Sequence, residues 1–236
     1  MKAMILKKGI IKKIIFGVVG TLVLFIIIIF INLIILEKDA SVVSKGQPIE
    51  NFSGRNAALI VIDIQESTTG EISMNPFYKK NSEYLINNIN RISEYFKGQN
   101  LPVIYVRSEI TDPLINLLNS SYAKGSAGAK YDKRLNIVSG LEVVKNRNDA
   151  FRNSNLDNIL TGGKINELYI VGLDASECVN TTVEAALNRN YKVKLIEEGI
   201  LSKSTEMKDS MIVNFKNRGV KVISMDSLKL TEKHTL

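Results

Sequence analysis

The feature that most restricts the fold of this 236-residue chain is an uncharged stretch near its start. Residues 14–36, IIFGVVGTLVLFIIIIFINLIIL, contain no Asp, Glu, Lys or Arg. As a helix this stretch would measure about 34 Å, enough to cross a hydrocarbon core about 30 Å thick. A signal peptide has a shorter apolar region of about 7–15 residues and a small-residue cleavage site, which the following LEKDASVV matches only weakly. We therefore predict an uncleaved transmembrane helix over residues 14–36.

The charges on either side of this stretch predict its orientation. Glu37, Lys38 and Asp39 follow it and nearly cancel, whereas five lysines precede it: Lys2, Lys7, Lys8, Lys12 and Lys13. Positively charged flanks remain in the cytoplasm. We therefore predict a single-pass protein of the cell membrane, with a basic cytoplasmic tail over residues 1–13 and the following domain outside the cytoplasm. Residues 37–56 are predicted to be a polar linker that tethers this domain to the membrane.

The net charge of +7 does not indicate nucleic-acid binding, because more than half of it lies in residues 1–40. The remainder of the chain has no dense basic patch and no aromatic residues interleaved with basic ones. The expected partners are the membrane, through residues 14–36, and a small-molecule substrate. The sequence leaves open whether the chain forms a homo-oligomer.

Residues 57–230 are predicted to form one domain in which strands alternate with helices. Short apolar runs predict strands over residues 57–63, 101–108, 141–146, 166–174, 191–199 and 219–226. Helical periodicity predicts helices over residues 75–100, 155–163, 178–190 and 204–219. This alternation is typical of a three-layer α/β/α domain with a mostly parallel, doubly wound sheet. The long irregular stretch over residues 109–140 predicts a lid or a substrate loop.

Three reactive side chains fall at or just beyond the ends of predicted strands. Asp63 ends the first strand, Lys145 ends EVVK, and Cys178 stands between a strand and the helix that follows it. Each also has a structural explanation, since an aspartate can cap a helix, a lysine can be solvated and a cysteine can fill a core. Ligands of parallel sheets bind at the carboxyl ends of the strands, so we expect the three side chains to meet there.

Together these residue types predict an acyl-transfer site. Cys178 is the only cysteine, and the positive end of a helix and the Lys145 ammonium both favour the thiolate form. Lys145 would keep Asp63 ionised, and Asp63 would take the thiol proton and return it to a leaving group. Backbone N–H groups of the turn DASEC would face the oxyanion. The only histidine, His234, lies in the terminal TEKHTL, which argues against a Cys–His pair.

Four motifs, in this order and spacing, resemble the isochorismatase-like cysteine hydrolases over residues 57–227. They are ALIVIDIQ, GSAGAKYDKRL, VVKNRNDAF and LYIVGLDASECVNTTVEAALNRNYKVKLIEEG. This superfamily also holds nicotinamidases and N-carbamoylsarcosine amidases. The resemblance implies that Asp63, Lys145 and Cys178 are the catalytic residues. It also implies a cis peptide bond between Leu173 and Asp174, with the N–H groups of Asp174 and Cys178 forming the oxyanion hole.

The sequence departs from the family in its membrane anchor and in its metal motif. Nicotinamidases carry an aspartate and two histidines after the second strand, where this chain has no histidine, so we predict no metal and no cofactor. True isochorismate hydrolases lack the cysteine, so Cys178 favours a small amide, imide or ureide as substrate. The alternatives are an isochorismate-type ether hydrolase and a non-catalytic binding module anchored at the surface. Gln65 and Phe151 are candidate substrate-binding residues by position only, and each has an equal structural explanation.

Overall fold

The computed structural model describes residues 2–50, 52, 54 and 56–230, with side chains described from Lys12 to Leu228. The chain forms two compact units. The first is a helical segment that ends at Asp39, and the second is a domain that begins at Ala40.

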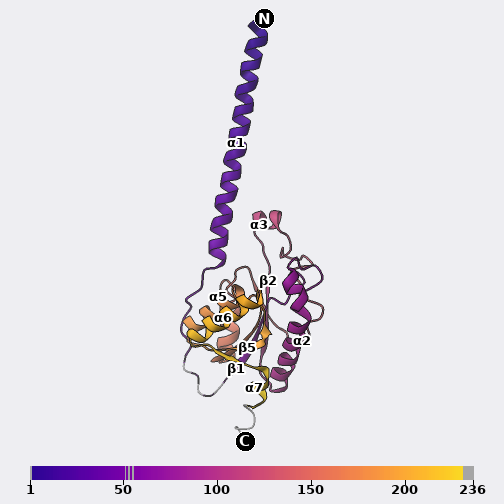
Figure 1. The fold of residues 1–236 in the computed structure, drawn as a ribbon. Coiled ribbons are helices and arrows are strands. Elements are labelled where there is room, and N and C mark those ends of the chain that lie inside the picture. Colours follow the sequence, from indigo (N-terminus) through magenta and orange to yellow (C-terminus); the bar gives the residue numbers. More distant parts are fainter. Residues whose placement is uncertain (1, 51, 53, 55, 231–236) are drawn as a thin grey trace. The chain divides into compact units, whose positions relative to one another are not determined.

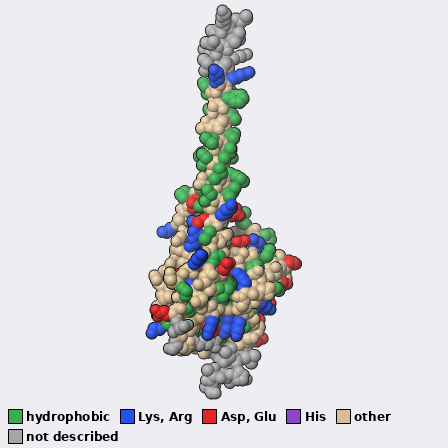
Figure 2. All heavy atoms as spheres, turned by 90° about the vertical axis from the view of Figure 1, so that its left-hand side faces the viewer, with side chains coloured by type: hydrophobic (Ala, Val, Ile, Leu, Met, Phe, Trp, Pro, Cys, Tyr) green, Lys and Arg blue, Asp and Glu red, His purple; other side chains and the backbone are tan. Residues whose placement is uncertain are grey.

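The first unit consists of helix α1 (Lys2–Ala40) up to Asp39, and this helix is longer than the predicted span over residues 14–36. Residues 37–40 continue the helix because none of them is a glycine or a proline. Between Lys12 and Ala40 the helix is long and apolar enough to cross a membrane, a test that a signal sequence near the N-terminus would also pass. Its apolar side chains are exposed along much of its length, as the green atoms along the helix in Figure 2 show.

The second unit is built on a six-stranded sheet whose neighbouring strands are all parallel, in the order β3-β2-β1-β4-β5-β6. The strands are β1 (Ala57–Ile62), β2 (Val103–Ser108), β3 (Leu141–Lys145), β4 (Glu167–Gly172), β5 (Lys192–Ile200) and β6 (Lys221–Ile223). The helices are α2 (Pro76–Gly98), α3 (Pro113–Leu118), α4 (Leu156–Gly162), α5 (Cys178–Asn188), α6 (Thr205–Asn217) and α7 (Met225–Leu230). The predicted α/β architecture is therefore confirmed.

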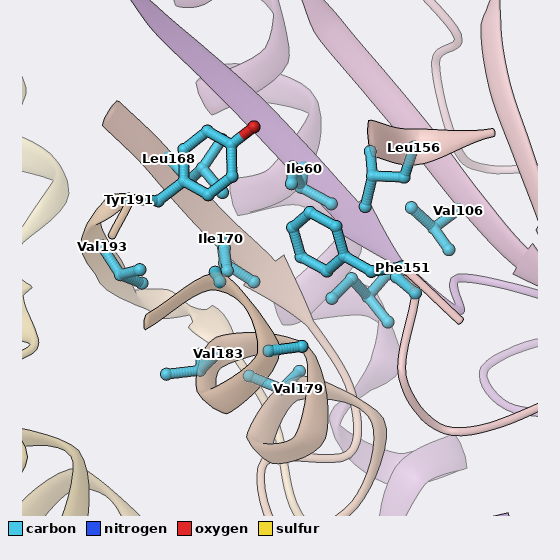
Figure 3. Packing of buried hydrophobic residues seen from close by; sticks show 14 of the residues in the cluster. Ile60, Val106, Phe151, Leu156, Leu168, Ile170, Val179, Val183, Tyr191 and Val193 are labelled. Atoms are coloured by element: carbon cyan, nitrogen blue, oxygen red, sulfur yellow. The ribbon is translucent and has the colours of Figure 1, made fainter. Parts of the chain in front are cut away.

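Helices cover both faces of this sheet, so its central strands are buried on both sides (Figure 1). In β1, Leu59 and Val61 pack with α2 on one face, while Ile60 and Ile62 face the core shared with α4, α5 and α6. Figure 3 shows this second core, where Ile170 of β4 lies nearest to the α5 side chains Val179 and Val183, and Ile60 of β1 lies beside Phe151. Burial on both faces explains why β1 reads as a continuous apolar run and does not alternate.

The structure describes most of the predicted linker over residues 37–56, whose role as a tether stays a prediction. Residues 37–40 belong to α1, and the segment that follows packs on the domain through Val43 and Ile49. The Ser44 N–H donates to Asp149 Oδ2 at 2.8 Å, and Ile49 N–H donates to the carbonyl of Arg189 at 2.9 Å. Residues 51, 53 and 55 lie outside the described residues. The strand predicted over residues 219–226 is also shorter, because Met225 begins α7.

Candidate active site

A cavity of about 240 Å³ opens at the carboxyl ends of β1, β2 and β4. This position agrees with the rule that ligands of parallel sheets bind at the carboxyl ends of the strands. The described residues that line the cavity are Asp63, Thr68, Tyr78, Ser108, Ile110, Tyr122, Asn148, Leu173, Asp174, Glu177 and Cys178.

Asp63 follows β1 directly and is only 4% exposed. Its backbone N–H extends the ladder to β2 by donating to the carbonyl of Val106 at 2.9 Å. Its φ of 55° turns the chain away from the strand direction, an orientation that aspartate tolerates better than most residues. Thr68 supports this turn, because its hydroxyl donates to the Asp63 carbonyl at 2.6 Å.

Lys145 ends β3 and lies behind the cavity wall with a side chain that is 1% exposed. Its ammonium has three N–H donors, and each has an acceptor. Nζ lies 2.8 Å from Asp63 Oδ2, 2.7 Å from Ser108 Oγ and 3.2 Å from Cys178 Sγ. The side chains of Asp63, Lys145 and Cys178 therefore lie together in the structure, as predicted. Because both atoms lie so close to Lys145 Nζ, Asp63 Oδ2 and Cys178 Sγ are close enough to each other for one water molecule to bridge them.

Ser108 was missed from the sequence although it ends a predicted strand. Besides accepting from Lys145, its hydroxyl donates to Asp63 Oδ1 at 3.1 Å. Its place in the sequence could have indicated this, because β2 is parallel to β1 and β3 and its last residue therefore lies at the same edge of the sheet as Asp63 and Lys145. A serine where a strand ends also has a structural explanation, because its hydroxyl can hydrogen-bond to nearby backbone groups in a turn.

Cys178 is the first residue of α5, and its sulfur lies 3.8 Å from Asn148 Oδ1. Burial raises the pKa of the Cys178 thiol, and the negative charge of Asp63 raises it further, while Lys145 only partly opposes them. Burial lowers the pKa of Lys145, but the charges of Asp63 and Cys178 raise it more, so the lysine remains protonated. One ammonium thus faces two acidic groups and compensates only one negative charge. Burial and Asp63 therefore act against the thiolate form, in the direction opposite to the helix end and the Lys145 ammonium.

The turn before Cys178 carries the two backbone N–H groups of the predicted oxyanion hole, and both residues line the cavity. The peptide bond between Leu173 and Asp174 is cis, as the resemblance implied. The carbonyl of Asp174 accepts from the N–H groups of Glu177 and Val179, both at 3.1 Å. Within the described part of the chain, the N–H groups of Asp174 and Cys178 donate to no backbone or side-chain acceptor. Their role as an oxyanion hole remains a prediction.

The Asp174 carboxylate orients this turn through hydroxyl donors that the sequence did not point to. It accepts from the hydroxyls of Tyr78 at 2.6 Å and Ser202 at 3.0 Å, and from the N–H of Ser176 at 2.6 Å. Burial, together with this hydrogen bond to Asp174, raises the pKa of Tyr78 well above its usual value. Tyr78 therefore remains a neutral donor. No local pattern could have found it, because α2 brings it to Asp174 from 96 residues away.

Gln65 and Phe151 are not walls of the cavity, which corrects their prediction as substrate-binding residues. Gln65 is fully buried, and its side-chain amide donates to the carbonyls of Ser108 at 3.0 Å and Ala129 at 2.9 Å. Phe151 is buried in the core, with the Arg189 guanidinium 4.3 Å from the centre of its ring. Position along the chain was misleading because residues close in sequence to a reactive side chain commonly point in other directions.

The charges on the cavity wall are acidic. Asp63, Asp174 and Glu177 line it, whereas none of the described lining residues is a lysine or an arginine. Lys145 lies behind the wall, and Lys203 pairs with Glu177 at 2.8 Å. Among the residues whose side chains are described, no three His, Cys, Asp or Glu form a group that could hold a metal ion. The metal-free site remains a prediction.

Comparison with known proteins agrees with this geometry. The chain is 30% identical over 160 residues to the N-carbamoylsarcosine amidase of an Arthrobacter species, covering 62% of this chain and 60% of that protein. The chain thus spans about three fifths of the length of that amidase. It is 28% identical over 181 residues to a probable inactive nicotinamidase of Arabidopsis thaliana, covering 71% of this chain and 91% of that protein.

A solved structure and a family model extend the comparison. The N-carbamoylsarcosine amidase of Thermoplasma acidophilum aligns with a TM-score of 0.61 and 26% identity, over 72% of this chain and 96% of that one. The model of the isochorismatase domain matches residues 57–227, which include Asp63, Lys145 and Cys178. Because this match covers well over half of the chain, the protein belongs to the isochorismatase domain family.

Proposed function

We propose that this protein is a membrane-anchored cysteine hydrolase that cleaves a small amide, imide or ureide through a thioester intermediate. The observation that carries the proposal is the set of three hydrogen bonds from one buried ammonium, which join Asp63, Ser108 and Cys178 beside a cavity. Burying a charged lysine is costly unless the charge is paired. A carboxylate held beside a thiol at a cavity is typical of a functional site.

In the first half of the proposed reaction, Cys178 Sγ attacks the substrate carbonyl carbon while the thiol proton passes to the Asp63 carboxylate. The carbonyl oxygen becomes an oxyanion that the N–H groups of Asp174 and Cys178 would stabilise. Asp63 then returns the proton to the leaving nitrogen, the C–N bond breaks, and ammonia or an amine departs. Because the resting thiol is neutral, attack and proton transfer are coupled, and Lys145 keeps the Asp63 carboxylate ready to accept.

In the second half, a water molecule attacks the thioester carbonyl and gives a proton to Asp63. The tetrahedral intermediate collapses, the C–S bond breaks, and the sulfur recovers a proton from Asp63. The products are the free thiol and a carboxylic acid, so neither an oxidant nor a reductant is consumed. Lys145 and Ser108 do not exchange protons in this scheme, and they hold the carboxylate and the sulfur in place.

The cavity favours a small, neutral substrate. Its volume of about 240 Å³ is below the range of about 300–1,000 Å³ that is typical of drug-sized ligands. Its acidic wall would repel the two carboxylates of isochorismate, which places ether hydrolysis second to amide hydrolysis. A third candidate, a binding module without turnover, is kept because one relative is described as a probable inactive nicotinamidase.

We further propose that residues 14–36 anchor the protein in the cell membrane and that the domain over residues 57–230 lies outside the cytoplasm. The apolar length of α1 supports the anchor, and the lysines before the span support the orientation.

The test is a screen of the full chain in detergent for ammonia release from a panel of small neutral amides and ureides. We expect release by the wild type and a loss of at least about 10³-fold in Cys178→Ala, since the nucleophile is removed. The melting temperature of Cys178→Ala should stay close to that of the wild type. Turnover that survives in a folded Cys178→Ala protein would contradict the mechanism. Pyruvate release from isochorismate without amide cleavage would favour the ether hydrolase, and no turnover of either would favour the binding module.

A further inference from the structure

Helix α3 exposes an apolar surface beside the cavity. Its sequence, PLINLL, has no charged residue, and none of its side chains is buried. Leu117 is 80% exposed and Leu118 is 60% exposed. The helix is nevertheless anchored, because the Asp112 carboxylate caps it by accepting from the N–H groups of Leu114 and Ile115 at 2.9 and 3.1 Å. An ordered apolar helix turned toward solvent is a feature of interaction sites.

The loop that carries α3 starts and ends at the cavity. Ile110 and Tyr122, which flank the helix, both line the cavity wall. They are held together because the Ile110 N–H donates to the carbonyl of Tyr122 at 2.7 Å. The helix therefore forms the tip of a loop whose base is part of the candidate active site, and it stands apart from the layers of the domain in Figure 1.

The chain enters the domain at the same edge of the sheet. The carbonyl of Ala40, the last residue of α1, accepts from the N–H of Asn148 at 3.0 Å, three residues beyond the end of β3. The Glu109 N–H, directly after β2, donates to the carbonyl of Lys145 at 2.8 Å. The loop that receives Ala40 and the loop that carries α3 thus leave neighbouring strands side by side.

These observations point to a lipid surface as the partner of α3. Three residues lie between the end of the proposed span at residue 36 and Ala40, and because they continue α1 this part of the chain covers only about 6 Å. The interfacial layer on each side of a bilayer is about 5–8 Å thick, so the edge of the domain that holds Ala40 lies within a short reach of it. Leucine side chains on short exposed segments insert into this layer.

We propose that Leu117 and Leu118 of α3 insert into the membrane that α1 crosses, beside the mouth of the cavity. The proposal rests on the proposed anchoring of the chain by α1. It implies that the cavity opens close to the membrane surface, so that substrates concentrated at this surface would reach it first. Contact of α3 with a second copy of the chain is the competing outcome.

The experiment uses tryptophan fluorescence, because the chain contains no tryptophan. Leu117→Trp is introduced into the full chain, which is reconstituted in phosphatidylcholine vesicles whose lipids are brominated near the headgroup end of the acyl chains. Bromine quenches a tryptophan that contacts it. The matched control is Val213→Trp in α6, an apolar residue that is 57% exposed. The positive control is Phe25→Trp, at the middle of the proposed span, reconstituted in vesicles whose lipids are brominated near the ends of the acyl chains.

We expect brominated lipids to remove most of the emission of Leu117→Trp and Phe25→Trp and to leave that of Val213→Trp unchanged. If Phe25→Trp is quenched but Leu117→Trp behaves like Val213→Trp, the membrane contact of α3 is refuted while the anchor stands. If Leu117→Trp is shielded from a water-soluble quencher but unaffected by bromine, a protein surface covers α3 and the proposal is also refuted. Phe25→Trp without quenching would refute the anchor and, with it, the proposal.

Discussion

At the scale of single residues, the Lys145 ammonium determines how charge is distributed at the site. It is the only cation that contacts Asp63 and Cys178 among the described residues, and it can neutralise one of these two acidic groups. A second negative charge in this buried region would be uncompensated and costly. In the proposed mechanism the proton therefore stays on the thiol until the substrate is attacked, and Asp63 is both the partner of Lys145 and the acceptor of the thiol proton.

This distribution predicts opposite effects of Asp63→Asn on reactivity and on turnover. Removing the carboxylate removes one of the causes that raise the thiol pKa and leaves Lys145 to stabilise the thiolate, so the pKa of Cys178 should fall. We expect iodoacetamide to alkylate the variant at least about tenfold faster at pH 7, because each unit of pKa changes the thiolate fraction tenfold. Amide hydrolysis should fall by at least about 10²-fold, because the proton carrier is lost.

Alkylation is measured by mass spectrometry, with Cys178→Ala as the blank, since the chain has one cysteine. If alkylation and hydrolysis fell together in Asp63→Asn, the carboxylate would be needed to form the thiolate, and the resting thiol would have been assigned wrongly.

Lys145→Met should destabilise the domain more than any other change at the site. Methionine keeps the apolar stem but leaves the Asp63 carboxylate, 4% exposed, without its cation. Breaking a buried pair in this way costs about 3–5 kcal/mol in the free energy of unfolding, measurable by urea denaturation at pH 7. The double variant Asp63→Asn, Lys145→Met should recover part of the loss, because no charge is then left unpaired. Equal losses in the single and double variants would mean that packing, not charge, sets the cost.

At the scale of elements, the end of β4 depends on Gly172. Its φ is +124°, and a Cβ atom there would lie 2.1 Å from the carbonyl oxygen and 2.7 Å from the nitrogen of Ile62 in β1. Because both contacts are backbone atoms of a central strand, neither can move without disturbing the β1–β4 pairing. This close approach lets β4 turn into the segment that carries Asp174 and Cys178.

Gly172→Ala is therefore expected to lower the free energy of unfolding by at least about 2 kcal/mol, as strain at a special backbone position does. The matched control is Gly140→Ala, where a Cβ atom would meet no described atom within 4 Å. It should change stability by no more than about 0.5 kcal/mol. Urea unfolding of both variants, followed by circular dichroism, makes the comparison. Similar losses in the two would show that the approach of β4 to β1 is less restrictive than the geometry indicates.

At the scale of the whole molecule, the proposed topology predicts which side of the membrane holds the domain. Five lysines precede the span, and the three charged residues after it nearly cancel, so the N-terminus should remain in the cytoplasm. Protease added to intact spheroplasts should remove the domain and leave a short membrane-bound fragment. A domain that is protected until the membrane is broken would reverse the orientation. An exposed thiol outside the cell is open to oxidation, but with no second cysteine in the chain it cannot form an internal disulfide.

The sequence by itself was enough to predict the α/β architecture and the position of Asp63, Lys145 and Cys178 at one edge of the sheet. Both follow from local pattern, because buried parallel strands are continuous apolar runs and the carboxyl ends of such strands share an edge. The apolar length of α1 is likewise a local property of the chain.

Only the tertiary structure decided how the site is completed and how its protons are arranged. Tyr78 reaches Asp174 across 96 residues, and Ser44 reaches Asp149 across 105. Contacts at such separations depend on how helices and segments pack, which no short pattern encodes. The hydrogen bond from the Gln65 amide to the Ser108 carbonyl and the raised pKa of the Cys178 thiol depend on packing in the same way. A helix N-terminus and a lysine favour the thiolate in isolation, but burial and the charge of Asp63, which act on the sulfur only in the folded domain, raise the pKa of the Cys178 thiol.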